Sequence, residues 1–197
     1  MAREIPTAEG TLGPFFPPRY VDEGCNDLTR MAGRTARGEA IHIAGTAVQE
    51  DGKPLHNLLV EAWQADAAGI HAHPADPRHA QADPDFLGWG RAATDAQGRY
   101  ALTTIRPGRV QEGAVLRAPH INLVIVFSGV MRNLYTTLFF DDGAGNDTDP
   151  VLLSVPAGRR DLLLARREFG TSAGAGPARY RFDIRLRGPG ELPFFEL

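Results

Sequence analysis

Apolar and polar residues alternate in several short segments of this chain, and each segment ends at residues that favour turns. Residues 41–48 and 180–186 follow the period of two that is typical of a half-buried strand. Asp51-Gly52 and Pro107-Gly108 are turn pairs between such segments. The pattern predicts strands over residues 41–48, 58–64, 99–105, 117–127, 135–140 and 180–186. Many short strands joined by turns predict an all-β fold, a β-sandwich of mainly antiparallel strands.

The longest apolar run, residues 117–127, is expected to be a buried strand. It is too short to cross a membrane as a helix, and it is rich in β-branched residues. His120 and Asn122 lie two residues apart, which places them on the same face of the strand. Two interpretations stay open. Neighbouring backbone satisfies both side chains, as is usual for buried polar groups, or the pair marks a present or former metal site.

The two ends of the chain differ from its middle. Residues 1–38 are expected to form an irregular arm, because the prolines within residues 11–18 remove backbone donors and fix φ. This arm packs either on its own domain or on a partner subunit. Residues 39–197 are expected to form the sandwich. Residues 161–167 are compatible with a helical turn or a loop, and the apolar tail over residues 192–197 is expected to pack on the domain or on a partner.

Composition excludes several classes of protein. The 197 residues are enough for one well-buried domain, and a net charge of −3 with a pI of about 6.1 argues against nucleic acid as the main partner. The single Cys25 excludes an internal disulfide and fits a reducing compartment. No apolar run follows Met1, and none is long enough to span a bilayer. We therefore expect a cytoplasmic protein without a signal peptide or membrane segment.

Residues that carry chemistry are few. His71, His73 and His79 lie near Asp76 and Asp83, and His-x-His spacing occurs in zinc and iron sites. Residues 65–82 are rich in Pro, Ala and Asp, which favours a solvated loop over the rigid elements that usually carry metal ligands. The chain has no Gly-x-Ser-x-Gly motif, phosphate-binding loop or dinucleotide fingerprint.

Several motifs, in order, resemble those of the intradiol ring-cleavage dioxygenases. The first is the Glu-x-Trp-Gln-Ala-Asp-x-x-Gly segment at residues 61–69. It is followed by residues 85–91, 94–100 and 104–108, by Pro119-His120-Ile121-Asn122, and by residues 138–142 and 180–184. The resemblance runs from Thr11 to the C-terminus, and several ordered motifs together are specific.

The resemblance implies ferric iron held by two tyrosinates and two histidines, with dioxygen attacking between the two oxygenated carbons of a catechol ring. Catalytic members have His-x-His where this chain has His120-Ile121-Asn122. Their tyrosines follow the Pro-Gly turn, where this chain has Arg109-Val110, and the glycine of the first motif, where it has His71. An amide and an isopropyl group cannot replace imidazole and phenolate on ferric iron. We therefore expect no metal ligand and no catalytic residue in this chain.

The same departure characterises the α chain of two-chain members, in which a homologous β chain carries the Fe(III). The resemblance therefore implies a hetero-oligomer of αβ units, an iron-bearing β subunit as partner, and a small aromatic carboxylate as substrate. It places the substrate at the α–β junction, facing Thr11, Gly13 and Pro14 of the arm. It also implies an arginine after the core strand. Ser128 occupies that register, and Arg132 is the candidate four residues on.

Two other functions are compatible with the pattern. A non-enzymatic transthyretin-like binding module would use the same succession of strands and turns over residues 41–105. A metalloenzyme would use His71, His73, His79 and His120.

Overall fold

Most of the protein is one sheet of hydrogen-bonded strands. The computed structural model describes residues 16, 20, 24–31, 33–128, 130, 132–168 and 176–196. The strands are β1 (Arg30–Met31), β2 (Arg34–Thr35), β3 (Ala40–Val48), β4 (Leu58–Trp63), β5 (Trp89–Ala93), β6 (Arg99–Ile105), β7 (Gln111–Glu112), β8 (Val115–Leu116), β9 (His120–Phe127), β10 (Leu134–Phe140), β11 (Leu164–Glu168), β12 (Ala178–Arg181) and β13 (Ile184–Arg185). The helices are η2 (His79–Gln81), α1 (Pro150–Ser154) and η3 (Ala157–Leu163), of which only α1 is an α-helix.

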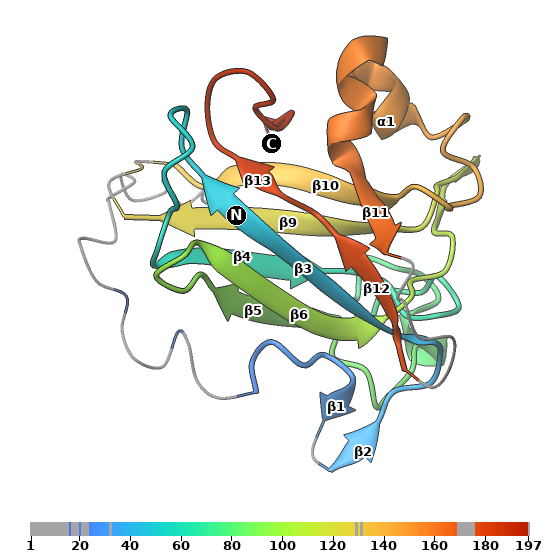
Figure 1. Cartoon of the computed structure of the whole chain (residues 1–197). Coiled ribbons are helices and arrows are strands. Elements are labelled where there is room, and N and C mark those ends of the chain that lie inside the picture. Colours follow the sequence, from blue (N-terminus) through green and yellow to red (C-terminus); the bar gives the residue numbers. More distant parts are fainter. Residues whose placement is uncertain are drawn as a thin grey trace, which may run out of the picture.

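The main sheet has nine strands in the order β13-β3-β12-β11-β10-β9-β4-β5, with β6 paired to β3. In Figure 1, β3, β6 and β12 pass in front of β4, β9 and β10. The strand β11 joins the two groups, because Leu164 and Ala165 pair with β10 while Arg166 to Glu168 pair with β12. The all-β prediction is confirmed. The finer prediction of a sandwich stays a prediction, since the hydrogen bonds run through both groups.

One hydrophobic cluster lies between the two groups of strands. It contains Ile41 and Ile43 from β3, Leu102 from β6, and inward residues of β4, β9 and β10 such as Leu123 and Phe140, all nearly inaccessible. These positions alternate with more exposed ones along β3, as the period of two predicted. Each fully buried side chain of this size stabilises the fold by about 1.5–3 kcal/mol, so the facing strands hold each other.

A smaller cluster covers the opposite face of β9 and β10. Ala118 and Phe139 pack there against Leu152 and Val155 from the α1 region and Leu163 from η3. Residues 161–167, which the sequence left undecided, form the end of η3 and the start of β11. These short elements were missed because their apolar residues serve two different packing faces, and no single period runs through them.

The strand predicted over residues 180–186 is interrupted, which corrects that prediction. The break falls at Phe182 and Asp183, between β12 and β13. The Asp183 carboxylate accepts the backbone N–H of Thr46 at 2.9 Å, and the Phe182 carbonyl accepts the Tyr100 hydroxyl at 2.6 Å. The same carbonyl lies 1.8 Å from where a Cβ on Gly45 would stand, so only glycine allows this approach. Side chains thus take over bonds that a continuous ladder would make.

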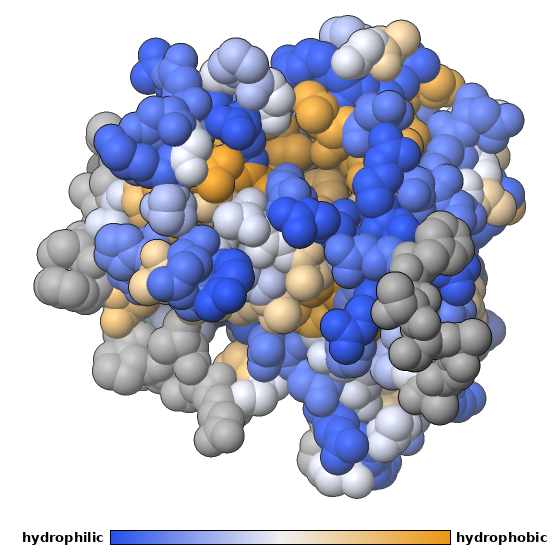
Figure 2. All heavy atoms as spheres, in the orientation of Figure 1, coloured by the Kyte–Doolittle hydropathy of each residue, from blue (hydrophilic) through white to orange (hydrophobic). Residues whose placement is uncertain are grey.

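The apolar C-terminal segment packs on its own domain, in agreement with the first of the two alternatives. Leu192 is buried, the backbone N–H of Phe195 donates to the Tyr135 carbonyl at 2.8 Å, and the Thr136 hydroxyl donates to the Pro193 carbonyl at 2.8 Å. Figure 2 shows hydrophobic atoms gathered between this segment and α1, within a largely polar face. In the part of the chain that the structure describes, no helix has the length and apolar character needed to cross a bilayer.

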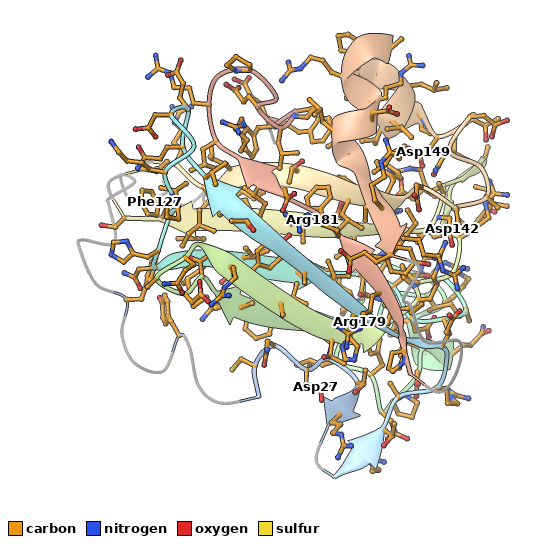
Figure 3. All side chains as sticks on the ribbon, in the orientation of Figure 1. Asp27, Phe127, Asp142, Asp149, Arg179 and Arg181 are labelled. Carbon is orange, nitrogen blue, oxygen red and sulfur yellow. The ribbon has the colours of Figure 1, made fainter. Side chains whose placement is uncertain are left out.

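Asp149 joins the start of β9 to α1. Its carboxylate accepts the Arg117 Nε at 2.8 Å and the Ala118 N–H at 2.9 Å, and it caps α1 through the N–H groups of Val151 and Leu152. Its side chain is 0% exposed, and Figure 3 labels it beside the first turn of α1. Burial alone would raise the pKa of this carboxyl, but the hydrogen bonds from Arg117 and the backbone lower it. Asp149 therefore fixes where β9 begins.

We predict that Asp149→Asn lowers the free energy of unfolding by about 3 kcal/mol, because it leaves a buried guanidinium with one carboxylate fewer. Urea unfolding monitored by circular dichroism measures the change. Asp147→Asn, at an exposed position two residues away, is the matched control and is expected to stay within about 0.5 kcal/mol of the parent chain. Equal stability of the two variants would contradict the role assigned to Asp149.

Candidate functional site

A row of side chains crosses the outer face of four neighbouring strands. Trp89 of β5 pairs with Trp63 of β4, Trp63 pairs with Asn122 of β9, and Asn122 pairs with Thr137 of β10. Residues directly opposite one another in antiparallel strands have side chains on the same face, about 4.5–5.5 Å apart at Cβ. The Thr137 hydroxyl donates to the Asn122 Oδ1 at 3.0 Å. The sheet thus presents an indole and an amide side by side.

His120 lies on the same face as Asn122 but is covered. Its ring is 3% exposed, packs 5.9 Å from the Phe139 ring, and has its Nδ1 2.7 Å from the Ala118 carbonyl. Burial lowers the pKa of His120, so the imidazole is held neutral. Asn122, by contrast, is exposed. Of the two interpretations of this pair, satisfaction by neighbouring backbone is confirmed for His120. For Asn122 it is wrong, because that side chain is exposed and its Oδ1 accepts from the side chain of Thr137.

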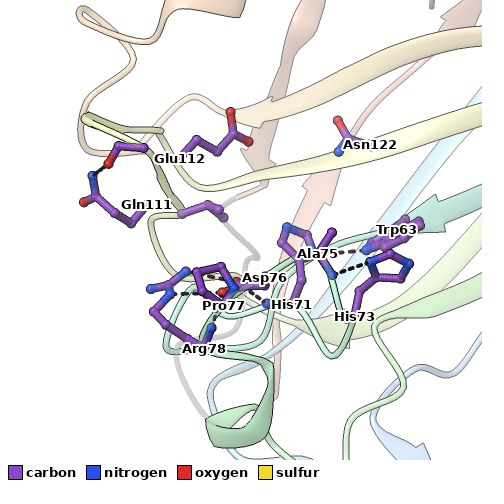
Figure 4. A pocket seen from close by; sticks show the side chains of 12 residues that line it. Trp63, His71, His73, Ala75, Asp76, Pro77, Arg78, Gln111, Glu112 and Asn122 are labelled. Atoms are coloured by element: carbon purple, nitrogen blue, oxygen red, sulfur yellow. Dashed lines mark hydrogen bonds and ion pairs between the residues drawn. The ribbon is translucent and has the colours of Figure 1, made fainter.

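A cavity of about 650 Å³ opens beside Trp63 and Asn122. Figure 4 shows its walls: the two strands on one side, the loop from His71 to Arg78 below, and Gln111 and Glu112 of the β7–β8 hairpin opposite. Val110, which precedes the hairpin, also lines it. The cavity therefore gathers residues from four segments: β4, the loop from His71 to Arg78, residues 110–113, and β9.

Close backbone packing brings two of these walls together. Gly69 has a φ of +74°, and a Cβ there would lie 1.9 Å from the Arg109 carbonyl oxygen. Only glycine tolerates both the positive φ and this approach. The segment before His71 is consequently held against the segment before Val110. His71 and Val110 therefore line the same cavity.

Trp63 and His71 share a hydrogen bond that fixes the protonation of the imidazole. The Trp63 Nε1 donates to the His71 Nδ1 at 2.9 Å, and an indole N–H can only donate. Nδ1 therefore carries no proton, and the proton of the neutral ring lies on Nε2. Burial lowers the pKa of His71 below its ordinary value of 6.5, which keeps this neutral form dominant at pH 7.

An ion pair ties the His71 loop into shape. Arg78 donates to the two oxygens of Asp76 at 3.2 and 3.1 Å and to the Gly69 carbonyl at 2.8 Å, while Asp76 also accepts the His71 N–H at 3.1 Å. Burial works to raise the pKa of Asp76, but the bonds from Arg78 and His71 outweigh it and lower the pKa to about 2. The loop predicted to be solvated is exposed at His73 and His79. On the side that faces the cavity, its residues are half-buried and held by these hydrogen bonds.

The positions that correspond to the implied iron ligands come together only in part, and they do not fit ferric iron. His71, Val110 and Asn122 all line the cavity, but they offer an imidazole whose Nδ1 is already bonded, an isopropyl group and an amide. His120 is covered by the cluster around Phe139. Fe(III) prefers anionic oxygen donors, and none of these four side chains supplies one. Over the described residues, no three His, Cys, Asp or Glu side chains are grouped so as to hold a metal ion.

The other residues singled out by sequence fall in different places. Thr11, Gly13 and Pro14 lie outside the described residues, so their expected role stays a prediction. Arg132 is exposed between β9 and β10, beyond the far end of β9 from Asn122, and does not line the cavity. His79 lies in η2 and has its Nδ1 2.8 Å from the Asp76 carbonyl. Asp83 is buried and accepts the Arg37 N–H at 2.6 Å.

Sequence reasoning missed several residues of the cavity. Trp63 was read only as part of a motif, and the β7–β8 hairpin with Gln111 and Glu112 was not predicted. The hairpin has two-residue strands, which are too short to show a period. For Trp63, a signal was present: it follows the charged Glu61 by two residues on a strand, so it shares the outward face, and in the structure it is 44% exposed.

Comparison with known proteins gives consistent similarities. A profile of the family described as dioxygenase matches residues 12–188. The protocatechuate 3,4-dioxygenase alpha chain of Burkholderia cepacia is 36% identical over 200 residues, 97% of each chain. The beta chain from the same organism is 38% identical over 173 residues, 85% of this chain and 74% of that one. A solved dioxygenase domain from Streptomyces sp. SirexAA-E, part of a fusion with a carbohydrate-binding protein, has a TM-score of 0.61 at 27% identity, covering 94% of this chain and 100% of that one.

We predict that the Trp63 indole resonance titrates with a midpoint below pH 6.5, because protonation places a proton on the His71 Nδ1 and breaks the bond from Trp63. The contribution of this bond to stability is complete above the ordinary histidine pKa of 6.5 and is lost as the pH falls through the lowered pKa of the folded state. Two-dimensional ¹⁵N–¹H spectra recorded from pH 7.5 to pH 4.5 follow the indole signal.

His71→Phe should abolish this titration, whereas His73→Phe, on the same loop, should preserve it. A midpoint at or above pH 6.5 in the parent chain would show that burial does not control His71.

Proposed function

This chain belongs to the family of intradiol ring-cleavage dioxygenases, and on that premise we propose that it is the α subunit of a protocatechuate 3,4-dioxygenase. In this proposal it assembles with a homologous β subunit in a hetero-oligomer of αβ units. The assembly cleaves protocatechuate with O₂ to 3-carboxy-cis,cis-muconate. Similarity to an alpha chain along 97% of both sequences supports the assignment.

The observation that carries the proposal is the set of side chains around the cavity. Three positions where catalytic members of the family have iron ligands hold His71, Val110 and Asn122, and these face one hollow. Because this donor set does not suit Fe(III), the iron belongs to the partner subunit. In this proposal the cavity stands where catalytic members hold the iron, but its side chains lack the donors that would bind the metal.

The task of the α subunit is then to complete the site of its partner. Residues 1–38 form the arm that reaches the partner, and residues 39–197 form the β-sandwich, in a protein of the cytoplasm. Thr11, Gly13 and Pro14 line the partner's pocket, where Thr11 donates a hydrogen bond to the substrate carboxylate. Arg132 is the candidate for attracting the same carboxylate, since a guanidinium pairs well with that group.

Contacts near Tyr20 support an arm that is anchored on this domain before it reaches outward. The Arg91 Nη1 donates to the Tyr20 carbonyl at 3.2 Å, and the guanidinium lies 4.6 Å from the centre of the Tyr20 ring. Arg91 is itself held by Glu61, with its Nε 2.7 Å from the carboxylate. An anchor at Tyr20 fixes one end of the proposed arm on this domain.

The alternative of a transthyretin-like binding module is less well supported. It explains the strands and turns, but family membership along residues 12–188 supports an enzyme subunit.

We predict that this chain, purified without its partner, is colourless and contains far less than one equivalent of iron. Metal analysis and visible absorption test this, and colour is expected only when the β subunit is added. A matched variant that combines His71→Tyr, Val110→Tyr and Asn122→His restores the missing donor types and should bind more iron than the parent. One equivalent of iron per isolated parent chain, with a tyrosinate band, would refute the assignment.

We further predict that Thr11→Ala raises the KM of the assembly for protocatechuate by about tenfold, because one hydrogen bond to a charged group is lost. The iron content should not change. Arg91→Met, which releases Tyr20, should raise KM in the same direction. Steady-state kinetics and metal analysis on the same preparations separate the effects: loss of iron in Thr11→Ala, or an unchanged KM, would argue against the arm's role.

A further inference from the structure

The cavity beside Trp63 contains hydrogen-bond donors that are directed to no other group. The His71 Nδ1 is occupied by Trp63, which leaves the N–H on Nε2. The Asn122 Oδ1 is occupied by the Thr137 hydroxyl, which leaves the two N–H donors of Nδ2. Within the described residues, neither nitrogen has a protein partner. Hydrogen-bond donors that line a cavity and have no protein partner can bind an acceptor atom of a ligand. The cavity is therefore suited to a ligand that carries an oxygen atom.

The same cavity offers an aromatic surface. The Trp63 side chain is 44% exposed, although it stands on a strand whose other residues are mostly buried. The His73 ring lies 5.5 Å from the indole, tilted by 59°. In Figure 4 these rings and Asn122 flank the same opening. A planar ring can pack on the indole while its substituent reaches the donors.

The charges around the cavity select against an anion. Arg78, which lines it, is paired with both oxygens of Asp76. Glu112 on the opposite wall shares Arg117 with the buried Asp149, so two carboxylates face one guanidinium. These five charged groups carry an excess of one negative charge. Among these five described groups no cation is left unpaired for a carboxylate ligand, whereas an uncharged ligand needs none.

We propose that this cavity is a metal-free binding site for an uncharged phenol, whose ring packs on Trp63 and whose oxygen accepts hydrogen bonds from His71 Nε2 and Asn122 Nδ2. The site goes beyond the proposed function, because it gives this chain a ligand of its own in addition to its role at the partner's pocket. Its preference for an uncharged ring is opposite to that of the carboxylate site at the subunit junction. The phenol is bound without any covalent or redox step.

The test uses the assembled α–β protein with 5-fluorotryptophan incorporated into this chain only, and Trp89→Phe assigns the two fluorine resonances. Phenol, benzoate and cyclohexanol are added separately at pH 7. Phenol should shift the Trp63 resonance along a saturable curve. Benzoate, which is charged, and cyclohexanol, which is not planar, should bind at least tenfold more weakly. The Trp63 signal reports on this chain even where phenol also enters the partner's iron site.

Two variants test the donors independently. Asn122→Leu and His71→Phe should each weaken phenol binding roughly fivefold to tenfold, since each removes one hydrogen bond. His56→Phe is the matched control, because His56 is exposed and lies outside the cavity, and it should leave the affinity unchanged.

The proposal is overturned by a shift that stays linear with phenol concentration, by benzoate binding as tightly as phenol, or by unchanged affinity in both donor variants. These results are separable from the fate of the proposed function, which depends on where the iron lies. A chain that binds phenol at Trp63 and also holds iron by itself would contradict the proposed function alone.

Discussion

The alternation of side chains along β9 is the constraint on which both the fold and the cavity depend. Successive residues of a strand point to opposite faces, so Ile121, Leu123 and Ile125 enter the core while His120 and Asn122 face outward. A shift of one residue in register would turn the polar pair towards the main core and the apolar side chains towards the outer face. The strand pairs with both β4 and β10, which fixes that register from two sides. Whatever the outer residues do chemically, the inner ones hold the strand in place.

The two outward residues of β9 have different environments because the covering elements stop between them. Asp149 holds Arg117, Ala118 and the start of α1 together, and the resulting cluster of Phe139, Leu152 and Leu163 closes over His120. Asn122 lies one pleat further on, beside Trp63, where the cavity opens on the sheet. The hydrogen bonds of one buried carboxylate thus hold the elements that cover His120. Asp149 is connected to the cavity through Arg117 and Glu112.

The sequence predicted the longer strands. β3, β6, β9 and β10 agree with the predicted ranges to within a few residues, because β3 shows the period of two, β9 lies in the longest apolar run, and turn residues bound the others. β11 was missed since it changes partner midway, and β12 was predicted too long since the Asp183 and Tyr100 side chains replace ladder bonds there. At the site, the motifs indicated His71, Asn122 and the turn before Val110. That these meet in one cavity with Trp63 depends on the close contact at Gly69, which is a tertiary feature with no local period.

The outer face tolerates exchange of its side chains because the inner face supplies the stability. The groups around the cavity are exposed or half-buried at Trp63, His71 and Asn122, whereas the core cluster contains residues that are nearly inaccessible. Burial of apolar area is the dominant stabilising contribution, so the identity of the side chains at His71, Val110 and Asn122 matters little for the scaffold. An imidazole, an isopropyl group and an amide offer no anionic oxygen to a trivalent cation. What remains is a hollow with an indole wall, two available donors and a slight excess of negative charge, and those properties together favour an uncharged ring over either a metal ion with its catecholate or a carboxylate.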